Sequence, residues 1–220
     1  MSASSTAILL FSRTASAEAK VKSFGAGQTG DDRIAQGLIE RTEATLAKTG
    51  FPVFRSCETS QVEGTFGQRL TNAMARVYAE GFERVLVVGN DCPSILPMHL
   101  RAAAQMLDNG QNVLGPDRRG GVWLIGLQRA DFFADKLVDL SWETPELYAD
   151  MMALFPEAID FASLGDLNSF EDLRQNWYFL RRQLAELFDL LLISEAAFGT
   201  PALEPEPVAV LRRLGRAPPV

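Results

Sequence analysis

Apolar and polar residues alternate in blocks along the first two thirds of the chain, and the blocks have the lengths of strands and helices. Continuous apolar runs predict two strands that are buried on both faces, Thr6–Ser12 and Arg84–Gly89. Further strands are predicted over Pro52–Cys57, Asn112–Leu114 and Val122–Leu127. Apolar residues three or four positions apart predict amphipathic helices: Asp31–Gly50, Phe66–Gly81 and Pro97–Asn109. The segment Ser16–Gly30 contains three glycines and is predicted to be a long loop.

This succession of strands and helices predicts a mostly parallel sheet with helices on both faces. In such sheets, ligands bind beyond the carboxyl ends of the strands. The loop after the first strand, Arg13–Gly30, and the loop after the third strand, Asn90–Leu96, are therefore expected to lie close together at the binding edge.

The last third of the chain has a different pattern. A short helix is predicted over Glu146–Leu154, and a longer one from Phe170 to about Leu192. The Leu- and Phe-rich stretch Phe179–Ile193 either packs on the domain or forms the face of a homodimer. We expect one domain over residues 1–195 and a Pro-rich tail over residues 196–220, with a homodimer through the C-terminal helix and tail as one alternative.

Composition narrows the classes of function. The chain has 220 residues and a formal net charge of −7, which argues against a nucleic-acid-binding protein because such proteins carry a basic face. No apolar run approaches the ~18 residues of a membrane span. Two cysteines and one histidine are too few for a disulfide scaffold or a zinc site. We expect a cytoplasmic protein with no nucleic-acid partner and no membrane span.

The strongest candidate for chemistry follows the third predicted strand. There, Gly89-Asn90-Asp91-Cys92-Pro93 places a carboxylate at the binding edge of the sheet. A carboxylate in this position suits a hard divalent cation, although Asp91 is equally suited to capping the following turn. Asp166-Leu167-Asn168 offers two more oxygen-bearing side chains, which serve either a metal or a helix cap.

Two further segments are candidates for ligand contact. Arg13, Lys20 and Lys22 follow the first predicted strand, where basic groups neutralise a diphosphate or remain as a solvated loop. The pair Gly120-Gly121 lets the backbone approach a ligand closely, or simply forms a turn between two strands.

Four motifs occur in order between Ala7 and Leu173: Gly89-Asn90-Asp91-Cys92-Pro93, Gly115-Pro116-Asp117-Arg118-Arg119-Gly120-Gly121-Val122, Trp142-Glu143-Thr144 and Asp166-Leu167-Asn168-Ser169-Phe170-Glu171-Asp172-Leu173. With this order the chain resembles the bacterial A-type glycosyltransferase-like proteins. These are also called selenodomain-associated or nucleotide-diphospho-sugar transferases, and they are related to the molybdenum-cofactor and phospholactate guanylyltransferases. Their pattern contains Gly-Ser-Asp-Cys-Pro, Gly-Pro-x-x-Asp-Gly-Gly-Tyr, Trp-x-Thr and Asp-x-Asp-Thr-x-x-Asp-Leu.

The resemblance implies a three-layer α/β/α sandwich with a mostly parallel mixed sheet, of the Rossmann-like class of nucleotide-diphospho-sugar transferases. It implies Mg²⁺ or Mn²⁺ near Asp91, which becomes the catalytic and metal-binding candidate, with Asp166 or Asn168 as a second ligand. The nucleotide or diphosphate would contact a further set of residues: Arg13, Lys20, Lys22, Asn90, Gly120 and Gly121.

Three departures from the family pattern concern the site. Arg119 stands where the family has an acidic residue, Val122 stands where it has tyrosine, and the Lys-Thr-Arg core of the basic loop is not intact. The function implied is metal-assisted transfer from a nucleotide-activated substrate, with glycosyl transfer from a nucleotide-diphospho-sugar as the first hypothesis. A nucleotidyltransferase that uses a nucleoside triphosphate is one alternative. A catalytically degenerate nucleotide-binding or scaffold protein of the same fold is the other.

Overall fold

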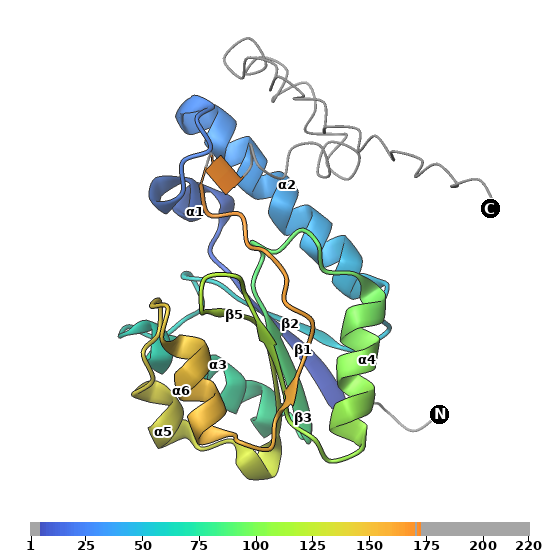
Figure 1. The fold of residues 1–220 in the computed structure, drawn as a ribbon. Coiled ribbons are helices and arrows are strands. Elements are labelled where there is room, and N and C mark those ends of the chain that lie inside the picture. The colour runs from blue at the N-terminus through green and yellow to red at the C-terminus, as the bar shows by residue number, and fades with distance from the viewer. Residues whose placement is uncertain (1–4, 170, 173–220) are drawn as a thin grey trace, which may run out of the picture.

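A single mixed sheet forms the centre of the computed structural model, which describes residues 5–169 and 171–172 (Figure 1). Its strand order is β2-β1-β3-β5-β4-β6. The strands are β1 (Thr6–Phe11), β2 (Val53–Ser56), β3 (Arg84–Val88), β4 (Val113–Pro116), β5 (Val122–Gln128) and β6 (Ile159–Asp160). The pairs β1–β2, β1–β3 and β4–β6 are parallel, while β3–β5 and β4–β5 are antiparallel. The predicted mostly parallel mixed sheet is thus confirmed.

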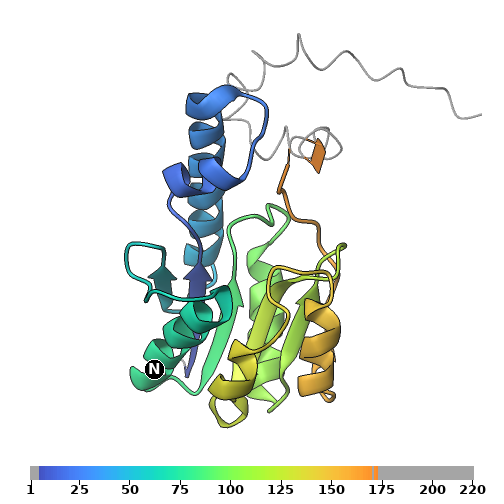
Figure 2. The same cartoon turned by 90° about the vertical axis from the view of Figure 1, so that its left-hand side faces the viewer.

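Helices cover both faces of this sheet, as Figures 1 and 2 show. The described helices are α1 (Ala15–Val21), α2 (Gly27–Ala47), α3 (Phe66–Ala79), α4 (Pro97–Asp108), α5 (Ala134–Val138) and α6 (Leu147–Leu154). One apolar cluster joins α3, α5 and α6 to one face of the sheet, and another joins α4 and the end of α2 to the opposite face. Along β1, Ala7 and Leu9 belong to the first cluster and Ile8 and Leu10 to the second, because successive side chains of a strand point to opposite faces.

The predicted long loop over Ser16–Gly30 is wrong. Seven residues of the segment that begins at Ala15 form α1, since its three alanines favour a helix, and α2 begins at Gly27 rather than at Asp31. The buried carboxylate of Asp31 accepts hydrogen bonds from the backbone N–H groups of Phe24 and Ala26, both at 3.1 Å. Asp31 therefore holds the turn that leads into α2 from a position inside the helix.

The topology brings three chain segments to one edge of the sheet. β1 and β3 are parallel neighbours, so Ser12 and Gly89 leave the sheet on the same side. β5 runs the opposite way, and the pairing of Val88 with Leu124 places the start of β5 at this same edge. The expectation that the loops after the first and third strands meet is confirmed.

Within the described part of the chain, no helix has both the length and the apolarity required to cross a bilayer. Of the helix predicted from Phe170 to Leu192, only residues 171–172 are described. The rest of it, the tail over residues 196–220 and the homodimer face assigned to them lie outside the described residues.

Candidate functional site

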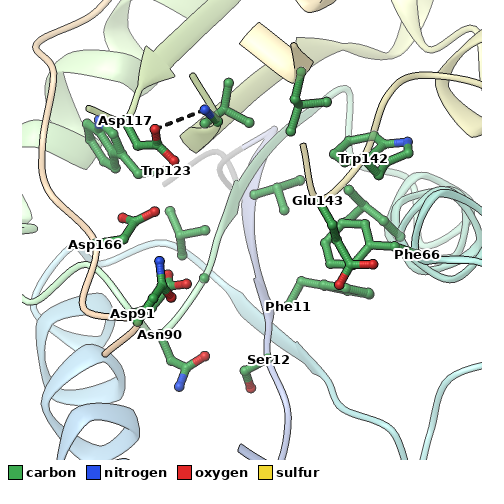
Figure 3. Close-up of a pocket in the computed structure, with 18 of the residues that line it drawn as sticks. Phe11, Ser12, Phe66, Asn90, Asp91, Asp117, Trp123, Trp142, Glu143 and Asp166 are labelled. Carbon is green, nitrogen blue, oxygen red and sulfur yellow. Dashed lines mark hydrogen bonds between the residues drawn. The ribbon is translucent and has the colours of Figure 1, made fainter. Parts of the chain in front are cut away.

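A cavity of about 490 Å³ opens at the edge of the sheet where β1 and β3 end (Figure 3). Residues from seven separate segments line it: the ends of β1 and β3, helix α1 with the adjoining Lys22, the first half of α3, the 117–125 segment, the 142–147 segment and the pair Asp166 and Asn168. A hydrogen bond of 2.7 Å from the N–H of Leu167 to the carbonyl of Asp91 joins two of these segments directly. This bond places Asp166 beside the Asp-Cys-Pro loop.

Three carboxylates occupy one side of the cavity: Asp91, Asp117 and Asp166 (Figure 3). The pKa of Asp166 is raised to about 8, first by burial and then by the nearby charges of Asp91 and Asp117 and a hydrogen bond with Asp117. Lys22 acts in the opposite direction but is outweighed. Asp166 therefore carries a proton at neutral pH in the ligand-free protein, unless a cation takes the proton's place.

Two cations line the cavity next to Glu18: Lys22, just after α1, and Arg13, just after β1. The Nζ atom of Lys22 lies 2.6 Å from Glu18 and 3.2 Å from Asp91, and its side chain is only 12% exposed. Burial lowers the pKa of Lys22, but the attraction of Asp91 and Glu18 and hydrogen bonds to both raise it overall. Arg13 pairs at 3.7 Å with both Glu18 and Glu143. Glu18, which is buried, thus holds both cations at the cavity.

Three buried side-chain polar atoms have no hydrogen-bond partner among the described residues, and all three belong to residues that line this cavity: Ser12 Oγ, Asn90 Nδ2 and Asp166 Oδ1. Buried polar atoms are normally paired, because an unpaired one costs about 1–3 kcal/mol. Their coincidence at one cavity indicates a site that completes its hydrogen bonds with a ligand.

The two glycines of the 115–121 loop have different environments. Gly121 lines the cavity and donates its N–H to Asp117 Oδ1 at 2.9 Å. Gly120 does not line it; it has φ of +88°, and a Cβ there would meet the carbonyl of Pro145. Gly120 therefore shapes the turn and lets it pack against the 142–147 segment.

Most of the residues predicted for the site line the cavity: Arg13, Lys22, Asn90, Asp91, Gly121, Asp166 and Asn168. Two do not line it, and their contact with a ligand stays a prediction. Gly120 is turned toward Pro145, and Lys20 is exposed on α1, two residues before Lys22 and on a different side of the helix. Arg119 lines the cavity as well, and its guanidinium donates to Asp172.

Sequence reasoning did not assign Ser12, Glu18 or Glu143 to the site. Ser12 carries a usable signal, since it is the first residue after a buried strand and such positions lie at the binding edge. Glu18 also carries a signal, because Lys22 lies four residues further along and such pairs meet on one side of a helix. Glu143 has no comparable signal, because its partner Arg13 lies far away in the chain.

The acidic side fits a hard divalent cation that takes only part of its ligands from the protein. Among residues 5–169 and 171–172, no group of three or more His, Cys, Asp and Glu side chains is close enough to hold a metal by itself. Mg²⁺ commonly uses one or two carboxylates and completes its shell with water and substrate phosphates. Asp91 and Asp166 supply two carboxylates, and the buried Oδ1 atom of Asp166 has no other partner.

The side of the cavity opposite the acids is aromatic. The rings of Phe11 and Phe66 meet edge to face at 5.3 Å between centroids, and the rings of Phe66 and Trp142 are also 5.3 Å apart. The indole N–H of Trp142 donates to the carbonyl of Leu137 at 2.7 Å, so Trp142 offers its ring to the cavity but no free donor. Glu143 lies beside Phe66 on this side (Figure 3).

Comparisons with known proteins agree with this architecture. A family model described as "Uncharacterized protein conserved in bacteria (DUF2064)" matches residues 32–144. No curated protein matches the sequence significantly. A structure provisionally described as a nucleotide-diphospho-sugar transferase, from Desulfovibrio desulfuricans G20, is similar with a TM-score of 0.74 and 18% identity, over 89% of this chain and 97% of that one.

Two other solved structures are less similar. Rv0371c from Mycobacterium tuberculosis H37Rv has a TM-score of 0.44 and 15% identity, over 80% of this chain and 98% of its own. A cytidylyltransferase from Leptospira borgpetersenii serovar Hardjo-bovis (strain JB197) has a TM-score of 0.46 and 16% identity, over 91% and 99% of the two chains. The fold is that of the Desulfovibrio structure, and because the family model spans more than half of the sequence, the chain belongs to the DUF2064 family of bacterial proteins.

Proposed function

We propose that this protein is a metal-assisted transferase that acts on a nucleotide-activated substrate, by glycosyl transfer from a nucleotide-diphospho-sugar. The observation that carries the proposal is the coincidence of the unpaired buried atoms of Ser12, Asn90 and Asp166 at one cavity. That cavity also contains the cations Lys22 and Arg13 and the carboxylates Asp91, Asp117 and Asp166, which is the combination that a diphosphate with its counter-ion requires.

Each group at the cavity has a task in this reaction. Lys22 and Arg13 hold the diphosphate, since both cations line the cavity and Glu18 keeps them in place. Asp91 and Asp166 hold Mg²⁺ or Mn²⁺, which supplies positive charge to the diphosphate as it leaves. Ser12 and Asn90 donate to the nucleoside from the ends of β1 and β3.

The second candidate is a nucleotide-binding protein of the same fold without catalysis, and Arg119 favours it. Where the resembled family has an acidic residue, this arginine pairs with the buried carboxylate of Asp172. A nucleotidyltransferase would use the same groups on a nucleoside triphosphate and would differ in the atom attacked, which is the α-phosphorus.

A thermal-shift screen tests the proposal. UDP-, GDP-, ADP-, CDP- and dTDP-glucose and the matching triphosphates are added with and without Mn²⁺ to the wild-type protein and to three variants. D91A and D166N each remove one proposed metal ligand. D139N is the matched control, because Asp139 is exposed and does not line the cavity.

We expect one nucleotide to raise the Tm of the wild-type protein and of D139N by about 5 °C or more at a hundredfold excess over Kd, and only with Mn²⁺. In D91A and D166N the gain from Mn²⁺ should disappear. A shift that D91A and D166N retain in full would contradict the metal site. The absence of any shift with every nucleotide would contradict the proposed function, and binding without turnover of any sugar donor would favour the non-catalytic candidate.

A further inference from the structure

Glu143 has a backbone conformation that L side chains rarely adopt. Its φ is +62°, and among residues 5–169 and 171–172 no other residue except glycine has positive φ. Backbone strain of this kind persists only where neighbouring contacts enforce it, and it concentrates at functional sites. Contacts of the neighbouring residues should therefore enforce the positive φ of Glu143.

The residues on either side of Glu143 are fixed by their own contacts. Trp142 is held by hydrogen bonds from its indole N–H and its backbone N–H to the carbonyls of Leu137 and Leu140, both 2.7 Å long. On the other side, the Thr144 hydroxyl donates to the carbonyl of Ser141 at 2.8 Å. The chain must turn sharply between these anchors, and the turn directs Glu143 to the cavity.

The side chain of Glu143 lies between the aromatic side of the cavity and Arg13. Its Oε1 atom is 3.7 Å from the Arg13 guanidinium, and the side chain remains 59% exposed. It is the carboxylate on the side away from Asp117 and Asp166 (Figure 3). The cavity thus has two ends: an acidic end with Lys22, which suits a diphosphate and its cation, and an aromatic end with one accessible carboxylate.

From this arrangement we infer that Glu143 is the general base that deprotonates the acceptor, and that the acceptor is a hydroxyl compound whose apolar ring face packs on Phe66 and Trp142. The inference rests on the proposed glycosyl transfer and adds the second substrate to it. Aromatic rings without free donors bind ring faces rather than charged groups, so the carboxylate of Glu143 is left to accept the hydroxyl proton.

The proton of the acceptor hydroxyl moves to a carboxylate oxygen of Glu143 as the acceptor oxygen forms a bond to the anomeric carbon of the sugar. The bond between that carbon and the diphosphate oxygen breaks, and the electron pair leaves with the nucleoside diphosphate. Arg13, which contacts Glu143, lies where it can also stabilise the charge on the departing group.

The test measures release of nucleoside diphosphate from the glucose donor that stabilises the wild-type protein, with water as the acceptor. E143Q preserves the shape of the side chain but cannot accept a proton, and E143A removes the side chain. E146Q is the matched control, because Glu146 is an exposed glutamate three residues further along that does not line the cavity. Sodium azide is added in a second series, because this anionic nucleophile needs no base.

We expect E143Q and E143A to release diphosphate about 10²–10⁴ times more slowly than the wild-type protein, with the metal-dependent thermal shift retained. Azide should restore turnover in E143A and yield a glycosyl azide. E146Q should react at the wild-type rate. E143G should raise the Tm by about 2–4 °C while it loses activity, because glycine adopts positive φ without strain.

Turnover by E143Q at the wild-type rate would overturn the inference. A loss of turnover in E143A that azide does not restore would also overturn it, because Glu143 would then only position Arg13. The inference is also overturned if the wild-type protein and all the variants bind the donor but none of them turns it over, with or without azide. Failure of the proposed function itself is distinguishable, since the wild-type protein would then show no metal-dependent shift with any nucleotide, and the inference would fall with it.

Discussion

Replacement of Asp166 by asparagine should stabilise the metal-free protein at neutral pH and flatten its stability between pH 5 and pH 7. The pKa of Asp166 is about 8 in the folded protein, against an ordinary value of 3.8. Between these two values the folded state binds a proton that the unfolded state has already released. The wild-type protein must therefore lose stability as the pH rises through this range.

The magnitude follows from the two pKa values. Each pH unit between them reduces the free energy of unfolding by about 1.36 kcal/mol. From pH 5 to pH 7 this amounts to about 3 kcal/mol, which is a large part of the 5–15 kcal/mol by which domains are usually stable. Above about pH 8 both states have lost the proton, so the contribution levels off. An asparagine at this position does not titrate, so the free energy of unfolding of D166N lacks this pH-dependent contribution.

Urea unfolding at pH 5, 6 and 7 in the presence of EDTA measures this difference, with the exposed D139N variant as the control. The free energy of unfolding of D166N should gain about 2–3 kcal/mol relative to the wild-type protein from pH 5 to pH 7, whereas D139N should follow the wild-type protein. Mn²⁺ added at pH 7 should stabilise the wild-type protein and leave D166N unchanged. A constant difference between D166N and the wild-type protein across the three pH values would refute the reasoning.

Three further outcomes are expected, each measured by urea unfolding. G120A should lower the free energy of unfolding by about 2–4 kcal/mol, since its Cβ would collide with a backbone carbonyl. G110A is the control: Gly110 also has positive φ but has open space around it, so G110A should cost only about 1 kcal/mol, and equal losses would contradict the packing argument. K22M should cost about 3 kcal/mol because it leaves Glu18 buried without the cation 2.6 Å away, and adding E18Q should recover part of the loss. L114A should cost about 2–5 kcal/mol because Leu114 is completely buried; a loss below 1 kcal/mol would contradict its place in the core.

Periodicity alone predicted most of the sheet and of the longer helices. Strands such as β1 and β3 are buried on both faces, and a strand of this kind has to be an uninterrupted apolar run. By contrast, β6 has only two residues and depends on its pairing with β4, so its sequence carries no pattern. Helix α1 was missed because glycines further along the segment hid a short alanine-rich helix.

The sequence by itself determined that Asp91 and Arg13 leave the sheet at its binding edge, because each follows a buried strand and the order of strands decides on which side the chain emerges. Only the tertiary structure decided the chemical state of the site. The pKa of Asp166 depends on charges that include Lys22, which is 144 residues away in the chain, and Lys22 pairs with Asp91, which is also remote in the chain. The left-handed backbone of Glu143 likewise depends on contacts of its neighbours. Electrostatic energies depend on distance in space and on burial, and neither quantity can be read from the order of residues.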